Sequence, residues 1–530
     1  MKKIGFTNFR RFKDFGPIEY GGITFLVGRN NAGKSTLVKA LLLIDNYFKA
    51  KDIFHFSFDN SVLEDVNVVT YGRAKHQNSD ENFIEFTFHF ENNLVEIKIT
   101  GEDDNSFGVV NELKVTDFGE NLKYIFNIQN KNLTVNHFKD NNFTPGDSWV
   151  RKVHEKRILD IKKQIESNTL KKTSKEYIEL VSTLDRLEKT KKADSSSIVF
   201  SLEEDFGGAV KLEEIVERLV VISKNRYERE FRDIQNNNKA SKDFKDLRAF
   251  YEFDPDLVTF TFQSFIDSMN GFSLSYLGAN AGKQSSLFNI RDKNNALAQA
   301  IHDFVQLNIE PGQKEYRFVQ KWMKEFEIGN DFEITMHAGE AYEMRITSND
   351  SKIQLADKGM GSIQAMLLIM RIACVIKRYG LVAVRKYNFL NEDAHTQDFW
   401  PRSVGNNIID LPPTIIIEEP ELNLHPALQS KLADLFHEVY AEYGMHLLVE
   451  THSEYILRKS QVIVAENELA VAPNDNPFCV HYFGNDYGQS PYQLKYQADG
   501  TFDKNFGDGF FDTASLDTLK LLRIKREKKA

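Results

Sequence analysis

Short runs of apolar residues recur along the chain, and several of them stop abruptly at polar residues. Ile23–Val27, Thr414–Ile417 and Met445–Val449 have the length and composition of strands buried in a parallel sheet. Stretches typical of helices follow the first run at Thr36–Leu43 and recur at Ala365–Ile376. Strands and helices of this kind predict an α/β fold.

The middle of the chain has a different pattern. No proline occurs between Pro145 and Pro255, and apolar residues recur at heptad spacing on both sides of Asn168–Lys175. We therefore predict a short antiparallel helical hairpin over Trp149–Lys192. The residues at heptad spacing are Ile158, Ile161, Ile165, Tyr177, Leu180, Leu184 and Leu187.

Composition and charge narrow the class of protein. With 530 residues, 41% hydrophobic and 27% charged, the chain is long enough for more than one globular domain. Its two cysteines, Cys374 and Cys479, imply neither a disulfide framework nor a zinc site. We find no signal peptide and no uninterrupted apolar run that could span a bilayer, so we expect a cytoplasmic protein with no membrane partner.

The balance of charge argues against a dedicated nucleic-acid coat protein, because the net charge is −10 and the pI is near 5.8. Two basic stretches, Lys152–Lys192 and Lys520–Lys529, could still touch phosphates. A run of charges is more often a solvated face, so these stretches alone do not establish nucleic-acid binding.

A phosphate-binding loop follows the first apolar run. Residues 28–35 satisfy the pattern G-x-x-x-x-G-K-[ST], with a predicted strand before and a helix after. Lys34 would reach the β- and γ-phosphates of a nucleotide, and Ser35 would hold Mg²⁺. The similar Gly278–Gln284 is one residue too short between its glycines, so we interpret it as a loop. The nucleotide-binding residues predicted here are Gly28, Asn30, Asn31, Ala32, Gly33, Lys34, Ser35 and Thr36.

Chemically active side chains also follow the other two predicted strands. Glu418 and Glu419 end one strand, and adjacent residues on a strand point in opposite directions. Because ligands gather at the carboxyl ends of strands in open α/β sheets, one carboxylate can contact the Mg²⁺ shell while the other faces the attacking water. A solvated pair in a loop is the alternative. His452 follows the last strand, where it could donate to a γ-phosphate oxygen.

These segments together resemble the head of an ABC-type ATPase, in the branch of SMC proteins, RecF, the overcoming-lysogenization-defect (OLD) ATPases and ATPases of anti-phage systems. The resemblance implies ATP and Mg²⁺ as cofactors, with Glu418 as the metal-side acid, Glu419 as the catalytic glutamate and His452 as the switch histidine. It also implies a homodimer or higher oligomer, in which Asn423–Pro426 contacts the partner head. The candidate signature loop, Asp357–Gln364, would cap the partner's ATP through Gly359, Gly361 and Ser362.

The same resemblance predicts an ABC-type head with a mixed sheet and a short coiled-coil insertion. The expected parts are an N-terminal lobe with the P-loop at 1–148, the insertion at 149–250 and a C-terminal lobe with an extension at 251–530. After His452 we expect strands at Phe478–Phe483 and Tyr492–Gln497, which leave too little chain for a Toprim nuclease domain. An HNH motif is also absent, so we expect an ATPase without nuclease activity that acts on a separate partner.

Among ATPases of this kind, the chain most resembles the Septu-type defence ATPases of the PtuA family, including those associated with retrons. Those ATPases pair with a separate HNH nuclease, and DNA or RNA, retron msDNA included, is a further expected partner. Two alternatives stay open. One is a RecF-like DNA-repair ATPase, and the other is the ATPase of a different defence system that holds a Toprim effector.

Overall fold

The computed structural model describes most of both ends of the chain. The predicted hairpin and the rest of the insertion over 149–250 fall almost entirely outside the described residues and stay predictions. The described residues are 2–50, 52, 54–59, 67–90, 93–118, 122–128, 132–137, 162–163, 165, 181, 274–278, 285–348, 351–392, 413–471, 476–484, 488–507, 517 and 520–525.

The chain divides into two compact units, and the division differs from the predicted one. The segment Tyr20–Val38, which contains the P-loop, belongs with Phe272–Asn406 and Leu411–Ala530 in unit 2. Unit 1 consists of Met1–Glu19, Lys39–Gly271 and Asn407–Asp410. The difference has a physical reason: the strand before the P-loop is hydrogen-bonded between two C-terminal strands, so it joins the C-terminal part of the chain.

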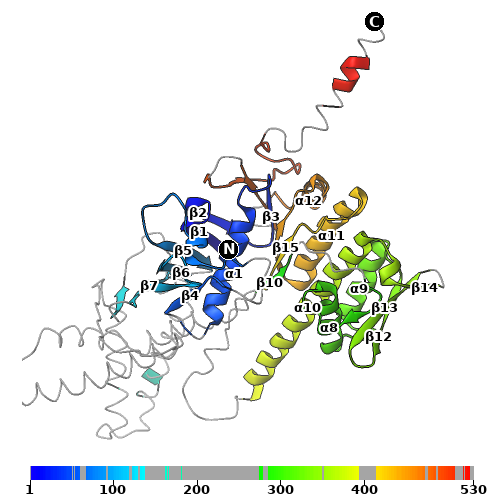
Figure 1. Ribbon diagram of the computed structural model, residues 1–530, viewed down its shortest axis with the longest axis horizontal. Helices are drawn as coiled ribbons and strands as arrows, with labels where there is room; N and C mark the ends of the chain where they lie inside the picture. The colour runs from blue at the N-terminus through cyan, green and yellow to red at the C-terminus, as the bar shows by residue number, and fades with distance from the viewer. Residues whose placement is uncertain are drawn as a thin grey trace, which may run out of the picture. The chain divides into compact units, whose positions relative to one another are not determined.

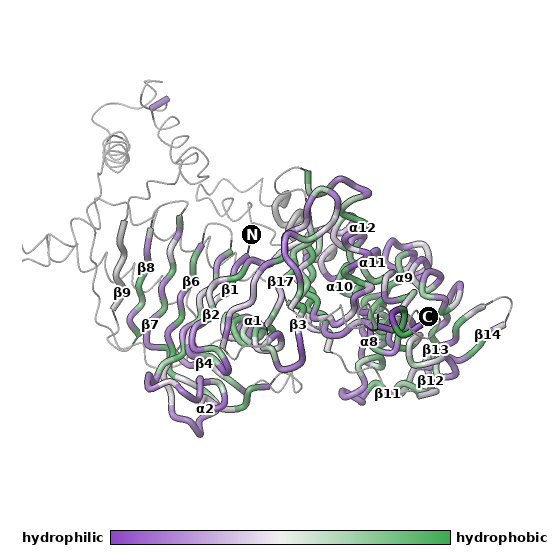
Figure 2. The backbone as a smooth tube through the Cα atoms, turned by 90° about the horizontal axis from the view of Figure 1, so that it is seen from above, coloured by the Kyte–Doolittle hydropathy of each residue, from purple (hydrophilic) through white to green (hydrophobic). Residues whose placement is uncertain are grey.

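Unit 1 is built on an eight-stranded sheet with the order β2-β1-β5-β6-β7-β8-β9, in which β4 also pairs with β7 (Figure 1). Along β5 and β6 every second residue is buried, and Figure 2 shows the matching alternation of hydrophilic and hydrophobic residues along β6. A short helix, α2 (Tyr71–Ala74), also lies in this unit. The strands are β1 (Lys2–Phe9), β2 (Phe12–Tyr20), β4 (His55–Ser57), β5 (Ile84–Phe90), β6 (Asn93–Thr100), β7 (Phe107–Asp117), β8 (Leu122–Asn127) and β9 (Asn132–His137).

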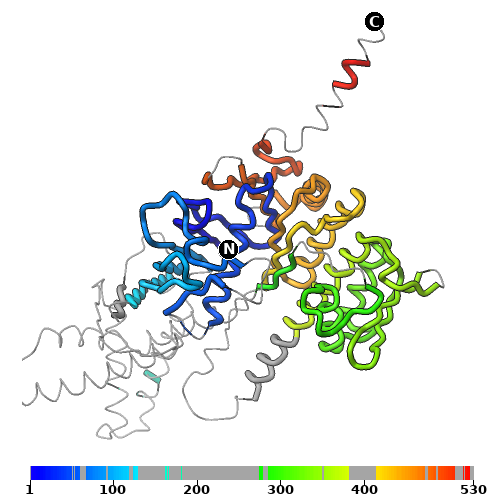
Figure 3. Tube along the Cα trace, in the orientation of Figure 1, coloured from blue at the N-terminus to red at the C-terminus, as the bar shows by residue number. Residues whose placement is uncertain are grey.

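Unit 2 contains a six-stranded sheet with the order β10-β15-β16-β3-β17-β18. All neighbours pair in parallel except the last two strands. In Figure 3 the colours of the two ends of the chain meet in this sheet, because β3 pairs with β16 and β17. The strands are β3 (Ile23–Gly28), β10 (Leu274–Leu277), β15 (Thr414–Glu418), β16 (His446–Glu450), β17 (Phe478–Phe483) and β18 (Tyr492–Leu494). The predicted α/β fold and the predicted core strands are therefore confirmed.

Helices follow the strands of this sheet and are capped by their own sequence. Helix α1 (Lys34–Lys49) begins inside the P-loop. Helix α11 (Pro426–Tyr443) starts with proline at a position that needs no N–H and ends at Gly444 in a left-handed conformation (φ 65°). Helix α12 (Glu454–Glu466) is capped by Ser453, whose side chain accepts from the N–H of Ile456.

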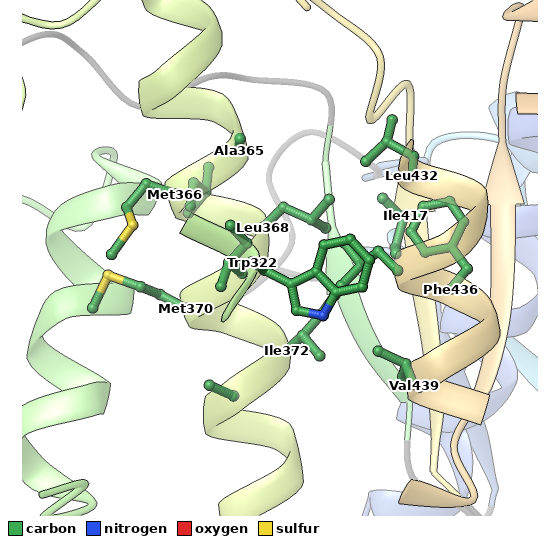
Figure 4. Close-up of a cluster of buried hydrophobic side chains, with 14 of the residues drawn as sticks. Trp322, Ala365, Met366, Leu368, Met370, Ile372, Ile417, Leu432, Phe436 and Val439 are labelled. Carbon is green, nitrogen blue, oxygen red and sulfur yellow. The ribbon is translucent and has the colours of Figure 1, made fainter. Parts of the chain in front are cut away.

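The rest of unit 2 is a four-stranded antiparallel sheet with helices beside it. Its order is β11-β13-β12, and β14 pairs with β13. The apolar faces of these helices join β15 and α11 in one core, whose buried side chains include Trp322, Met366 and Phe436 (Figure 4). The elements are β11 (Phe288–Asn289), β12 (Asp331–His337), β13 (Ala341–Ser348), β14 (Ser351–Gln354), α8 (Ala296–Gln306), α9 (Lys314–Glu325), the 3₁₀ turn Leu355–Asp357 and α10 (Met360–Glu392).

Helix α10 contains the predicted apolar helix Ala365–Ile376. By length and composition its segment Met360–Gly380 could cross a membrane, a property that the sequence analysis did not assign to it. Of its most apolar window, 72% is buried inside the protein. Packing against α8 and α9 in the core therefore accounts for its apolar composition.

Candidate nucleotide site

The P-loop joins β3 to α1 through a backbone that requires its glycines. Gly28 has φ 150°, and a Cβ there would lie 2.4 Å from the carbonyl oxygen of Phe483. Gly33 has φ 107°, and Asn31 occupies the left-handed region with φ 61°, which asparagine tolerates better than most residues. The first turn of the helix then closes from Gly33 O to the N–H of Thr36 at 3.0 Å. The predicted strand, glycine loop and helix are all present.

Lys34 is buried at the centre of this loop. Its Nζ donates to the carbonyl oxygens of Gly28 and Arg29, each at 3.1 Å. The same atom lies 3.6 Å from Glu450 Oε1 at the end of β16. Burial lowers the pKa of Lys34, and the carboxylate of Glu450 opposes that shift. The ammonium group is thus held at the loop, next to an acid from the neighbouring strand.

Ser35, the predicted metal ligand, is exposed in the first turn of α1. Its hydroxyl lies 3.3 Å from Oε1 and 3.2 Å from Oε2 of Glu450. Burial raises the pKa of Glu450 to about 7; Lys34 opposes this shift, and Glu418 adds to it. Glu450 therefore belongs to the site, although the sequence analysis gave it no role.

Glu418, the last residue of β15, and Glu419, the residue after it, have different surroundings. Glu418 Oε2 accepts a hydrogen bond of 2.9 Å from the hydroxyl of Tyr276 on β10. Glu419 has φ 44°, a strained conformation for a residue with a side chain, and its N–H donates to Glu450 O at 2.8 Å. Strain of this kind concentrates at functional sites, so the backbone favours Glu419 as a reactive residue.

His452 lies close to Glu419 at the edge of the sheet. The distance from His452 Nε2 to Glu419 Oε1 is 3.7 Å, and both side chains are about one-third exposed, at 30% and 33%. Burial, with a contribution from Lys34, lowers the pKa of His452 to about 4. The imidazole is therefore neutral at pH 7, with one N–H available to donate and one nitrogen to accept.

A further acid, Glu421, holds the loop that carries these residues. It is 8% exposed, and its Oε1 accepts a hydrogen bond of 2.6 Å from the N–H of His452. Burial raises its pKa. The hydrogen bond links the segment after β15 to the segment after β16, so Glu421 fixes the position of His452.

The candidate signature residues begin α10, and one of them touches the same loop. A Cβ on Gly361 would lie 2.5 Å from the carbonyl oxygen of Asn423, which has φ 62°. Gly359 has no neighbour within 4 Å of an added Cβ, and it is exposed. Ser362 is half-buried, and its N–H donates to Gly359 O at 2.9 Å. Gly361 therefore serves packing within its own chain, whereas Gly359 is open to solvent.

A comparison with protein families decides how this geometry is classified. The model of the AAA ATPase domain matches residues 1–457, which include the P-loop, the acids after β15 and His452. The chain belongs to the AAA ATPase domain family. No curated protein matches it.

Solved structures similar to this AAA ATPase domain include SMC heads. The Smc head domain of Pyrococcus furiosus with an extended coiled coil, bound to the C-terminal domain of ScpA, is 11% identical. That match covers 99% of this chain and 100% of the other, with a TM-score of 0.34. The SMC head domain from Thermotoga maritima is 10% identical. That match covers 93% of this chain and 98% of the other, with a TM-score of 0.31. The recombination mediator protein RecF-ATPrS of the RecFOR pathway is 12% identical, and that match covers 93% of this chain and 97% of the other, with a TM-score of 0.26.

The residues of this AAA ATPase domain fit a Mg²⁺ ion that a nucleotide helps to hold. Among the residues that the structure describes, no group of three or more His, Cys, Asp or Glu side chains could hold a metal ion. Magnesium in nucleotide sites needs fewer protein ligands, because phosphate oxygens and water complete its shell. The Ser35 hydroxyl and the carboxylates of Glu418 and Glu450 provide oxygen donors of the kind that Mg²⁺ prefers.

Sequence reasoning missed three residues of this AAA ATPase domain. Glu450 could have been found, because it ends a core strand in the same way as Glu418. Glu421 carried only a weak signal, since an acid in a loop is usually solvated. Tyr276 gave none, because β10 has four half-buried residues and no periodic pattern. The contacts of Glu421 and Tyr276 become visible only when the strand order is known.

Proposed function

We propose that the chain binds ATP with Mg²⁺ at the P-loop and hydrolyses it as an ABC-type ATPase. One observation carries the proposal: β3, β16 and β15 are consecutive neighbours in a parallel sheet. Their carboxyl ends therefore gather groups from three distant parts of the sequence. Such an edge is the usual ligand site of open α/β sheets.

The proposed roles follow from the chemistry of each group. The ammonium of Lys34 and the N–H groups at the start of α1 bind the β- and γ-phosphates. Glu419 orients and deprotonates the attacking water. His452, neutral at pH 7 because its pKa is about 4, donates its N–H to a γ-phosphate oxygen. Ser35, together with an acid at the sheet edge, holds the metal ion.

We also propose that the working unit is at least a homodimer of cytoplasmic heads. The resemblance to ABC-type ATPases supports this, since their signature segment caps the ATP of a partner. Gly359, within the candidate segment Asp357–Gln364, and Met360, the first residue of α10, are exposed, with Met360 at 37%. An exposed helix start is what a segment that contacts a second nucleotide requires.

For the wider role, we propose that the ATPase regulates a separate HNH nuclease in Septu-like anti-phage defence, with DNA or RNA as a further partner. The resemblance to PtuA-type ATPases supports this choice over a RecF-like repair ATPase or the ATPase of a Toprim system. Co-purification from the native operon followed by mass spectrometry distinguishes them. An HNH protein supports the proposal, whereas a Toprim effector or recombination proteins without a nuclease favour an alternative.

The test of the nucleotide site is Lys34→Ala. Truncating one partner of a buried charged pair costs about 2 kcal/mol or more, so ATP affinity should fall at least ~30-fold by titration calorimetry. Lys459→Ala is the matched control, because Lys459 pairs with Asp434 at 3.3 Å on α12, outside the loop. Equal affinities of wild type and Lys34→Ala would overturn the proposal.

A further inference from the structure

The metal-side acid of this site is open to a different assignment from the one that the sequence motif suggests. The motif gives that role to Glu418, at the end of β15. The carboxylate within hydrogen-bond distance of the Ser35 hydroxyl is instead that of Glu450, with both oxygens at 3.2–3.3 Å. Glu418 directs Oε2 to the Tyr276 hydroxyl at 2.9 Å. Ser35 is the residue that a P-loop uses to hold Mg²⁺, so the acid beside it is the better-placed second ligand.

The register of the sheet explains why two acids compete for the role. Glu418 and Glu450 are opposite each other in the pairing of β15 with β16. Strand β16 lies between β15 and β3, so its last residue is one strand nearer to the P-loop than Glu418. The side chain on the intervening strand therefore reaches Ser35.

The carboxyl groups at this edge also favour a bound cation. Glu418, Glu419, Glu421 and Glu450 contribute four carboxyl groups, whereas Lys34 is the cation that the described contacts place among them. Glu450 is only 6% exposed, so water screens its charge poorly. Lys34 pairs with Glu450 at 3.6 Å while its Nζ also donates to two carbonyl oxygens at 3.1 Å, so it offsets the charge of one of these four carboxyl groups.

We propose that Glu450 and Ser35 together bind the Mg²⁺ ion of the nucleotide, and that Tyr276 holds Glu418 in a supporting position. This inference rests on the proposed ATP site. It assigns to Glu450 a role that neither the P-loop nor the acidic motif after β15 predicts. Ser35 supplies a hydroxyl oxygen, Glu450 supplies a carboxylate oxygen, and the remaining positions of the ion belong to phosphate and water.

The test measures metal binding rather than turnover. Mn²⁺ is titrated into the full chain with ATP and followed by electron paramagnetic resonance, with separate titrations of ATP in the absence of metal. Glu450→Gln keeps the volume and a hydrogen-bond acceptor for Ser35 but removes the charge. It should raise the half-saturating Mn²⁺ concentration about 10–100-fold. ATP affinity without metal should not fall.

Two further variants guard against a purely structural effect. Glu450→Asp keeps the charge on a shorter side chain, and it should also weaken Mn²⁺ binding because the carboxylate no longer reaches Ser35. Glu454→Gln is the matched control on α12, where Glu454 bonds to Arg458 and is 38% exposed. It should bind Mn²⁺ like the wild type.

The outcomes separate this inference from the proposed function. If wild type and Glu450→Gln bind Mn²⁺ equally with ATP, Glu450 is not a metal ligand, and the ATP site stands. The same conclusion follows if Glu450→Gln lowers ATP affinity equally with and without metal, because such a loss indicates a structural role. If the wild type binds neither ATP nor Mn²⁺ in the presence of ATP, the proposed function fails and the inference fails with it.

Discussion

Two carboxyl groups in unit 2 are equally buried, but their pKa values are shifted in opposite directions. Glu343 and Glu450 are each 6% exposed. Glu343, on β13, accepts hydrogen bonds from Arg345 Nε at 2.9 Å, His337 Nε2 at 3.0 Å and Gln354 Nε2 at 2.8 Å. The bond from Arg345 is the largest of the causes that lower the pKa of Glu343 to about 2. Burial instead raises the pKa of Glu450 to about 7.

The difference follows from what surrounds each acid, because hydrogen-bond donors dominate at Glu343 whereas desolvation by burial dominates at Glu450. Glu343 has three donors from its own sheet, so its charge is already satisfied and its role is to stabilise β12, β13 and β14. Glu450 has one hydroxyl and a more distant ammonium group near it, together with other acids. Its charge is less well satisfied than that of Glu343, so a bound cation would stabilise it, as expected at a ligand site.

The largest effect, on the rate of ATP hydrolysis, should come from replacing Glu419. Glu419→Gln removes the base but keeps the shape, so the full chain should bind ATP while hydrolysing it ~10²–10⁴-fold more slowly. Phosphate release and ATP titration on one preparation measure both properties. Glu343→Gln should leave the rate per folded molecule unchanged. A Glu419→Gln chain that hydrolyses ATP at the wild-type rate would remove Glu419 from the chemistry.

The start of α10 offers a second comparison, between two glycines. Gly359→Asp should lower hydrolysis by about tenfold or more if this helix faces a partner's phosphate, because like charges repel, and it should leave the melting temperature unchanged. Gly361→Asp should lower both, since its Cβ would meet Asn423. Mixing Gly359→Asp with Glu419→Gln chains should restore some activity in independent sites. Hydrolysis by a strictly monomeric chain, insensitive to Gly359→Asp, would contradict the dimer.

Thermal stability should depend on Glu343, whose carboxylate accepts three hydrogen bonds. Glu343→Gln leaves Arg345 and His337 without their carboxylate, so it should lower the melting temperature at pH 7. The folded pKa of Glu343 lies below its ordinary value of 4.5, so its stabilisation is present above pH 4.5 and is lost as the pH falls toward 2. The gap between wild type and variant should therefore shrink over that range. A gap that is constant from pH 7 to pH 2 would show that the charge is not responsible.

The smallest effect is expected at Glu450. Its contribution to the free energy of unfolding should change with pH in the opposite direction to that of Glu343. Its folded pKa of about 7 lies above 4.5, so the ionised group destabilises the fold above pH 7, and this cost disappears as the pH falls toward 4.5. Without nucleotide or metal, Glu450→Gln should be more stable than the wild type at pH 8, by on the order of 1 kcal/mol, and equal to it near pH 4.5. Denaturant unfolding at the two pH values measures this. A variant less stable than the wild type at pH 8 would contradict the comparison.

Much of the α/β sheet could be predicted from the sequence, because buried parallel strands are continuous apolar runs. Ile23–Val27 and Thr414–Ile417 fall within β3 and β15, and Phe478–Phe483 coincides with β17. The predicted last strand, Tyr492–Gln497, is shorter in the structure and ends at Leu494. The P-loop could also be predicted from the sequence, because its spacing follows from how backbone groups surround a phosphate.

The rest depends on which strands become neighbours. The contact between Ser35 and Glu450 joins residues 415 positions apart and exists because β16 pairs with β3. The clash that a side chain at Gly361 would make with Asn423 likewise joins two distant segments. Local patterns do not encode such pairings.

The most direct test of the comparison is the thermal shift that Mg²⁺ adds when ATP is present. A ligand at 100 times its dissociation constant stabilises by ~2.7 kcal/mol, so the wild type should gain on the order of 5 °C. Glu343→Gln should gain as much from its own lower starting point, Glu450→Gln about half, and Lys34→Ala almost nothing. Equal gains for Glu343→Gln and Glu450→Gln, or a wild-type gain from ATP that needs no Mg²⁺, would contradict the account.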